Sequence, residues 1–218
     1  MQRRLISEFV GTAFLLIGVV GSGIMGAALS QGNDAVALLA NAAATGCVLY
    51  VIITTLGPIS GAHFNPVVTV AFALRGEHHW RDVLPYVAAQ IIGGIVGVWL
   101  THLMFDLSIL QTSSTMHRTG IAQWASEIIA TLGLLFVIFG GVHHRPDAVP
   151  PLVALYITGA YFFTSSTSFA NPAVTIARGL SDTFAGIYPD HVAMFVVMQF
   201  IGLGLAYLIL PYLFPKDS

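Results

Sequence analysis

The sequence predicts an all-α membrane protein with six transmembrane helices and two re-entrant half-helices, arranged as an inverted repeat. Three observations support this fold class. Of the 218 residues, 56% are hydrophobic and only 8% are charged, whereas soluble domains carry about 25% charged residues. Six apolar stretches approach or exceed the roughly 20 residues that cross a bilayer as a helix. A short motif that begins with Asn-Pro recurs once in each half of the chain.

The six apolar stretches are separated by polar segments. They are residues 5–29, 35–56, 83–105, 121–141, 149–164 and 192–214. The fifth stretch is the shortest, so we expect its helix to gain residues from its flanks. The first is too long for a removed signal peptide and lacks a small-residue cleavage site. We therefore expect all six to remain as membrane spans.

The distribution of positive charge predicts the orientation of the chain. Loops alternate between the two sides of the membrane, and basic residues concentrate in cytoplasmic loops. One side receives Arg3, Arg4, Arg75, Arg81, Arg145 and Lys216, and the other side receives Arg118 and Arg178. Both termini are therefore expected in the cytoplasm. The net charge of −2 does not indicate a nucleic-acid partner.

The recurring motif covers residues 65–71 and 171–177, which agree at five of seven positions. Asn is a preferred helix N-cap because its side-chain oxygen accepts from free N–H groups of the first turn, and Pro suits the first helical position. The residues that open the two copies are Asn65, Pro66 and Val67, and Asn171, Pro172 and Ala173. Each copy predicts a half-helix of about ten residues, 65–74 and 171–180, which is half a span.

The two halves of the chain are expected to be inverted relative to each other. Each half contains three spans, an odd number, so the second half enters the membrane upside down. The repeats are approximately residues 1–105 and 120–214 of one transmembrane domain, 1–218, and a polar external connection joins them. The two half-helices then point their N-termini at each other from opposite faces.

The segments before the half-helices predict a pore. Non-helical backbone at membrane depth must be buried in protein or line a water-filled cavity. Candidate pore-lining residues are Gly61, Ala62, His63, Ser165, Ser166 and Thr167. Two facing helix N-termini carry roughly half a positive charge each, which repels cations and protons. Because the side-chain oxygens of Asn65 and Asn171 are used for capping, their amide N–H groups remain to donate to water or a neutral hydroxylated solute.

Glu8 and Glu127 lie at matching positions within apolar stretches of the two halves. An ionisable residue at membrane depth is a candidate for a proton relay or a coupling-ion site. The alternative is that each carboxylate accepts from the irregular backbone before a half-helix, and the matching positions favour this structural role. No nucleophile, paired-acid or metal-ligand pattern at membrane depth suggests an enzyme, and with one cysteine, Cys47, a cysteine zinc site is excluded. We expect no metal or other cofactor.

These residues resemble the aquaporin and aquaglyceroporin family, also called major intrinsic proteins. The family signature is a pair of Asn-Pro-Ala boxes, with the run Ser-Gly-X-His-X-Asn-Pro present here at residues 60–66. The resemblance covers the whole chain. It implies the aquaporin fold, a right-handed bundle with one pore per subunit and usually a homotetramer. It also implies a passive channel for water and small neutral solutes, embedded in a lipid bilayer.

The narrowest point of this family is the aromatic/arginine selectivity filter, where the sequence departs from the pattern. By spacing from the boxes, its four positions fall on Thr45, Gly159, Ser168 and Val174. Water-selective members resemble one another at these positions: they have Phe at the first, His at the second and Arg at the fourth. The filter here is therefore expected to be wide and without a fixed positive charge. Arg178 lies one helical turn beyond Val174, outside the filter register.

The filter resembles that of a bacterial subgroup associated with arsenic resistance, in which Val replaces the filter Arg. This resemblance implies passage of glycerol-like solutes, neutral arsenite and methylarsenicals, and a location in the bacterial inner (plasma) membrane. Two alternatives stay open. Nearby aromatic residues, Tyr161, Phe162, Phe163 and Phe169, would refill the filter of a water-selective channel. A secondary transporter would instead use Glu8 and Glu127 as its coupling site.

Overall fold

The computed structural model describes residues 1–215, which form helices and connecting loops. Six long helices are present: α1 (Gln2–Leu29), α2 (Asp34–Ser60), α4 (Trp80–Met104), α5 (Ile121–His144), α6 (Val149–Phe163) and α8 (Pro189–Leu213). Two short helices are α3 (Pro66–Leu74) and α7 (Pro172–Arg178), and a 3-10 turn, η1, covers Pro146–Ala148. Lys216, one of the charges used to predict orientation, lies outside the described residues.

The six predicted spans correspond to the six long helices. Within the described part of the chain, five of them are long and apolar enough to cross a membrane by themselves. The sixth, α6, has 15 residues and is therefore only about 22 Å long. The α-helix gains no residues from its flanks, contrary to the expectation, and ends one residue before the end of the expected stretch; the 3-10 turn η1 leads directly into its start.

The two half-helices begin where the Asn-Pro motifs predict, and the first also ends at the predicted residue. The second ends at Arg178, two residues early. Beyond this point the amides of Gly179 and Leu180 donate to carbonyls three residues back. Such tighter bonds belong to a 3-10 turn, in which the α-helix ends.

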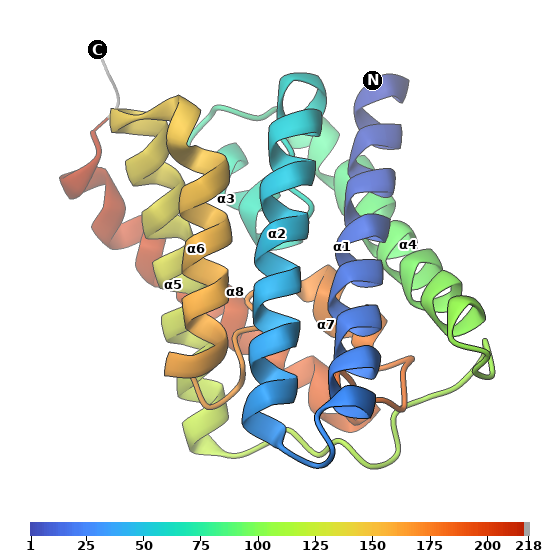
Figure 1. The fold of residues 1–218 in the computed structure, drawn as a ribbon. Helices are drawn as coiled ribbons and strands as arrows, with labels where there is room; N and C mark the ends of the chain where they lie inside the picture. The colour runs from blue at the N-terminus through green and yellow to red at the C-terminus, as the bar shows by residue number, and fades with distance from the viewer. Residues whose placement is uncertain (216–218) are drawn as a thin grey trace.

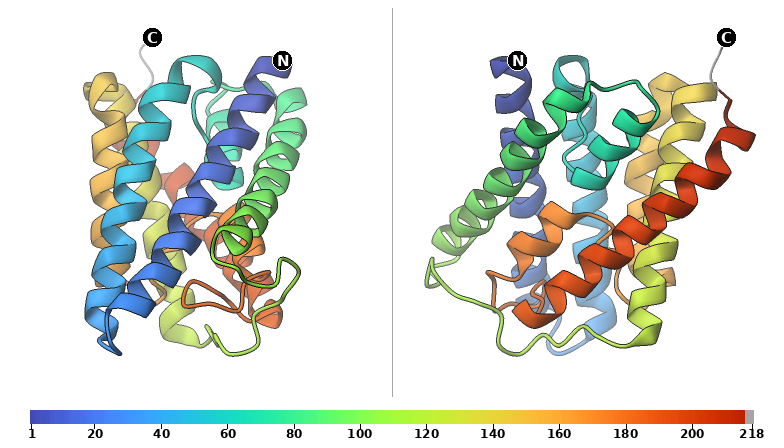
Figure 2. Two further views of the ribbon diagram at one scale, coloured as in Figure 1. Left: turned by 45° about the vertical axis from the view of Figure 1, so that its right-hand side comes forward. Right: turned by 180° about the vertical axis from the view of Figure 1, so that it is seen from behind.

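The helices form a bundle in which α3 and α7 meet near the middle of the molecule, as Figure 1 shows. Helix α1 packs against α2 and α4, α5 packs against α8 and α6, and the contact between α2 and α6 joins the two halves. Both half-helices pack against α4 and α8. The start of α1 and the end of α8 lie on the same side of the bundle (Figure 2).

Glycines allow the closest approach between helices of the same half. A Cβ added at Gly93 would overlap the carbonyl oxygen of Phe9, and the Cα of Phe9 would lie only 3.0 Å away. In the second half, a Cβ at Gly202 would come within 2.7 Å of the Ile128 carbonyl oxygen. Phe9 and Ile128 each follow one of the buried glutamates, Glu8 and Glu127. The glycines thus let α4 and α8 pack against the helices that carry these acids.

We expect Gly93→Ala to destabilise the folded protein by about 1–3 kcal/mol, because the new methyl group meets backbone atoms that cannot rotate away. Thermal unfolding in detergent measures the effect. The matched control is Gly204→Ala on α8, where no atom lies within 4 Å of the added Cβ and alanine favours the helix. Equal melting temperatures for the two variants would contradict the close packing at Gly93.

Candidate pore and selectivity site

Each half-helix begins with an asparagine that caps its own first turn. The Asn65 side-chain oxygen accepts from the Val67 amide at 3.0 Å, and that of Asn171 accepts from the Ala173 amide at 3.0 Å. Pro66 and Pro172 occupy the first helical positions, where an N–H group is not needed. The capping geometry predicted from the sequence is therefore present in both copies.

The amide groups of the same asparagines join the two half-helices. Nδ2 of Asn65 donates to the Ala170 carbonyl at 2.8 Å, and Nδ2 of Asn171 donates to the Phe64 carbonyl at 2.8 Å. Each acceptor is the residue that precedes the other asparagine. Because an amide nitrogen carries two hydrogens, one N–H of each asparagine remains for a solute. The sequence predicts free amide N–H groups on both asparagines, and the structure leaves one free N–H on each.

The two loops before the half-helices adopt matching left-handed backbone conformations. Ala62 and Phe64 have φ values of 50° and 48°, and Ser168 and Ala170 have values of 52° and 46°. Residues with side chains are uncommon in this region and cost free energy there. Other interactions must therefore stabilise this backbone conformation. In both loops, a buried glutamate carboxylate accepts hydrogen bonds from the loop amides.

Glu8, fully buried, holds the first loop. One carboxylate oxygen accepts from the Ser60 hydroxyl at 2.6 Å and the His63 amide at 3.0 Å. The other accepts from the Phe64 amide at 2.7 Å and the Gln90 side chain at 2.8 Å. Four donors thus satisfy this carboxylate and fix the loop backbone.

Glu127 repeats this arrangement in the second half and is also fully buried. It accepts from the Ser166 hydroxyl at 2.6 Å and from the Phe169 and Ala170 amides, both at 2.9 Å. Nε2 of Gln199 donates the fourth bond at 2.7 Å. The bonding matches the structural role considered for both acids, as each carboxylate meets two loop amides and two side chains.

A cavity of about 130 Å³ runs between the two halves. Its lining includes Asn65 and Asn171, together with His63 and Phe72 from the first half and Val174 and Arg178 from the second. A buried water needs only about 10–15 Å³ of such space. The cavity therefore has room for several waters or a small solute beside the two asparagines.

Three of the four filter positions lie on this cavity: Thr45, Ser168 and Val174. The Ser168 hydroxyl is buried and makes no hydrogen bond within residues 1–215. Thr45 lies 3.3 Å from the Tyr161 hydroxyl, measured between the two oxygens. Tyr161 also lines the cavity, so one aromatic side chain occupies part of the space that the sequence left open.

Gly159 does not lie on the cavity, and this part of the filter assignment is corrected. The α6 residues on the cavity are Val149, Val153, Ile157 and Tyr161, which recur every four positions along one face. Gly159 is halfway between the last two, and it is exposed. Residues two apart point to nearly opposite sides of a helix. Spacing from the Asn-Pro boxes does not determine the rotation of α6 about its axis.

The second loop contributes different residues to the cavity from those expected. Gly61, Ala62 and His63 line it as expected, whereas in the second loop the lining residues are Ser168, Phe169 and Ala170. Ser165, Ser166 and Thr167 are directed elsewhere. Ser165 is exposed and bonded to Ser126, the Ser166 hydroxyl donates to Glu127, and Thr167 accepts from Arg118.

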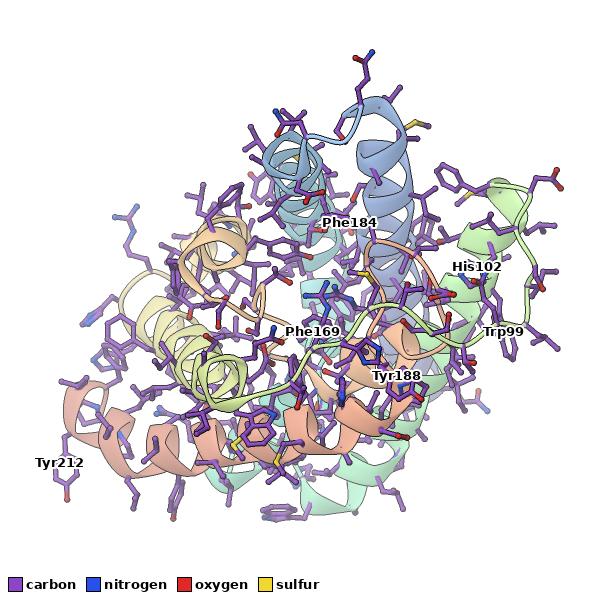
Figure 3. The ribbon with its side chains drawn as sticks, turned by 90° about the horizontal axis from the view of Figure 1, so that it is seen from below. Trp99, His102, Phe169, Phe184, Tyr188 and Tyr212 are labelled. Atoms are coloured by element: carbon purple, nitrogen blue, oxygen red, sulfur yellow. The ribbon has the colours of Figure 1, made fainter. Side chains whose placement is uncertain are left out.

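The three remaining aromatic candidates differ in where they lie. Phe162 and Phe163 are more than half exposed and lie on the outside of α6. Phe169 is buried, lines the cavity and packs edge-on against Phe195, with 5.2 Å between ring centroids. In Figure 3, Phe169 lies near the middle of the bundle and Tyr212 points away from its edge. Of the four aromatic candidates, Tyr161 and Phe169 are therefore the two that line the cavity.

The connection between the two halves, residues 106–120, lies at the end of the bundle opposite the chain termini (Figure 2). Asp182 accepts from the amides of Ser114 and Thr115 at 2.8 and 3.2 Å, and these bonds together with the Ser114 hydroxyl lower the pKa of its carboxyl group. Tyr188 donates its amide to the Met116 carbonyl. Arg118 follows directly, and its guanidinium reaches the carbonyl of Gly186 at 2.9 Å. No sequence pattern in the connection predicts where Arg118 docks, so only its charge could be used for the topology.

The histidines form no metal centre in the described residues. His63 is stacked on Phe72, with 4.9 Å between ring centroids, and lies near His78 and Tyr86. Burial and the nearby Arg4 lower the pKa of His78, which lies in the loop after α3.

Residues 1–170 match the sequence profile of a family described as "Major intrinsic protein". The chain belongs to this family. The resemblance inferred from the Asn-Pro boxes is thereby confirmed. Membership makes the chain an integral membrane channel for water and small solutes such as glycerol, and it is not an enzyme.

Similar proteins agree with the assignment to the major intrinsic proteins. "Aquaglyceroporin AqpS" of Rhizobium meliloti is 52% identical over 202 residues, which cover 93% of this chain and 86% of that protein. "Aquaporin Z" of Bradyrhizobium diazoefficiens is 28% identical, covering 81% and 78%. The X-ray structure of the aquaglyceroporin from Plasmodium falciparum superimposes with a TM-score of 0.74 at 18% identity, covering 95% of this chain and 94% of that one. The structural likeness confirms the fold.

We expect Glu127→Gln to lower the amount and thermal stability of this major intrinsic protein. Glutamine keeps the shape of the side chain but has only one oxygen acceptor. Donors from Ser166, Phe169 or Ala170 then lose their hydrogen-bond partner, and each loss destabilises the fold by about 1–3 kcal/mol. Thermal unfolding and water permeability in liposomes are the measurements. Glu77→Gln is the control, because Glu77 is exposed and pairs only with Arg75. A stable Glu127→Gln protein that loses only a pH-coupled flux would favour a coupling site instead.

Proposed function

We propose that this channel has a widened outer filter and passes neutral, hydroxylated solutes larger than water. Glycerol-like solutes, arsenite as As(OH)3 and methylarsenicals are the proposed classes. The supporting observation is that Thr45, Ser168 and Val174, all small or medium-sized, line the outer end of the cavity. Hydroxyl and carbonyl acceptors together with the asparagine N–H groups suit a solute with several hydroxyl groups.

The relatives favour a solute channel over a strict water channel. The relative that is 52% identical to this chain is named an aquaglyceroporin. The alternative of a water-selective pore has one specific observation in its favour, namely that Tyr161 and Phe169 both line the cavity. The hydroxyl of Tyr161 lies close to that of Thr45, so this ring narrows the pore with a polar edge, which still offers a hydrogen bond to a solute oxygen.

A secondary transporter fits the site less well than a passive channel. Coupling requires an acid that exchanges a proton or an ion during transport. Glu8 and Glu127 each receive four hydrogen bonds, two of them from the backbone of a loop. Releasing either carboxylate would leave these backbone donors without an acceptor. The observed bonding therefore supports gradient-driven flux.

The proposed setting is the inner membrane of a bacterium, with both termini in the cytoplasm and four channels in a homotetramer. The start of α1 and the end of α8 lie on one side (Figure 2), and Arg3, Arg4, Arg75 and Arg81 belong to that side of the sequence-based topology. We propose residues 1–218 as one channel domain of two inverted repeats, approximately 1–105 and 120–214. The matched pairs of Glu8 with Glu127 and Gln90 with Gln199 support this division.

The test is permeation through purified protein in liposomes. We expect wild-type protein to pass water, glycerol and arsenite, and Val174→Arg to reduce glycerol and arsenite flux more than water flux, because the larger side chain fills the outer cavity. Val174→Leu, which adds bulk without charge, is the control. Stopped-flow light scattering and arsenite uptake give the fluxes. A wild type that passes water alone would overturn the proposed solute range, and an equal loss of every flux in Val174→Arg would indicate misfolding.

Cysteine accessibility tests which residues face the pore. In a Cys47→Ser background, we expect Ser168→Cys to become sensitive to block by mercurials, since the side chain lies on the cavity and a reachable thiol reacts. Gly159→Cys is the matched control, because this position is exposed on the opposite face of α6. Water flux before and after the reagent is the readout. Block at position 159 with none at 168 would contradict the cavity described above.

A further inference from the structure

Two arginines without a carboxylate partner lie near Phe169: Arg178, which lines the cavity, and Arg118, which does not. Arg178, in the last turn of α7, is 2% exposed and lines the cavity. Arg118 comes from the external connection. The ion pairs of the described residues involve Arg4, Arg75 and Arg81, and neither of these two. Their charge is therefore not cancelled by an acid in direct contact.

Backbone carbonyls of one short loop hold both guanidinium groups. Arg178 donates through Nε to the Ala185 carbonyl. Arg118 donates to the Gly186 carbonyl at 2.9 Å and to the Phe184 carbonyl at 3.4 Å. Three consecutive carbonyls thus receive the two side chains. A Cβ at Gly186 would overlap the Ser181 carbonyl oxygen, so the loop is tightly packed where it makes these bonds.

The guanidinium groups of Arg118 and Arg178 both stack on the ring of Phe169. The Cζ atom of Arg178 is 3.4 Å from the centroid of the Phe169 ring, and that of Arg118 is 5.2 Å away. Guanidinium groups stack favourably on aromatic faces. Phe169 is itself buried against Phe195. The ring therefore fixes two positive charges next to the cavity that it lines.

Arg178 occupies the same face of α7 as Val174, four residues earlier. Residues four apart lie above one another on a helix, and long side chains point back toward the N-terminus. The terminal nitrogens of Arg178 make no hydrogen bond to any residue of 1–215, and they are not among the fully enclosed unpaired atoms. Since Arg178 lines the cavity, these donors are open to it.

We propose that Arg178, seated on Phe169 and supported by Arg118, is the charged selectivity element of the outer pore. It supplies the guanidinium that Val174 does not, from one helical turn further out. Its open N–H groups donate to oxygens of neutral polyols or undissociated oxyacids, and its charge repels cations and protons. The inference rests on the channel function but is independent of which neutral solute passes.

The experiment measures proton and water flux through each variant in the same liposomes. Wild-type protein is expected to show background proton flux. Arg178→Met should raise the ratio of proton flux to water flux about tenfold, because a nearby fixed charge is removed. The matched control is Arg75→Met, since Arg75 also stacks on a phenylalanine, Phe139 at 4.5 Å, but lies on the other side of the molecule. It should leave both fluxes unchanged.

A charge-relocation variant separates charge from structure. Val174→Arg together with Arg178→Met is expected to return proton flux to background, because a guanidinium again faces the outer cavity. Where Arg178→Met does not fold, Arg178→Gln takes its place, since an amide N–H can still donate to the Ala185 carbonyl without a charge. Background proton flux with normal water flux in either neutral variant overturns the proposal. Glycerol flux of the wild type, measured in parallel, reports separately on the proposed solute range.

Discussion

The structure depends on two buried carboxylates that hold non-helical backbone inside a membrane. Glu8 and Glu127 each accept from two consecutive loop amides at residues 63–64 and 169–170. The loops need this support because Ala62, Phe64 and their counterparts adopt left-handed conformations and lipid offers no hydrogen bonds. Each loop that is held in this way leads directly into the asparagine that caps its half-helix. The two acids therefore support the backbone from which both half-helices start.

Much of this could be predicted from the sequence because the relevant signals are local or repeated. Asn-Pro determines a helix start through capping, which involves only neighbouring residues, and the half-helix starts at Asn65 and Asn171 were predicted correctly. For Glu8 and Glu127 the sequence left a coupling site and a structural role open, and their equivalent positions favoured the structural role, which the hydrogen bonds to the loop amides support. The family assignment used the same motifs, and the match over residues 1–170 agrees with it.

The parts that sequence did not predict depend on rotation and on long-range docking. Whether Gly159 faces the cavity depends on the rotation of α6 about its axis, which no local sequence signal reports. In the structure Tyr161, two residues later, lines the cavity instead. The final three residues of the second loop, rather than Ser165–Thr167, reach the pore because Ser166 is bonded to Glu127. Arg118 reaches its site only through the fold of a connection whose anchor, Asp182, is far along the chain.

The reciprocal bonds of Asn65 and Asn171 have a consequence for how the protein is made. Each amide finds its acceptor on the opposite half of the chain, more than 100 residues away. During synthesis the first half enters the membrane with the Asn65 amide and the Phe64 carbonyl unpaired, and such groups are costly in hydrocarbon. The half-chain is thus an unfinished structure that exposes polar groups until its counterpart is inserted.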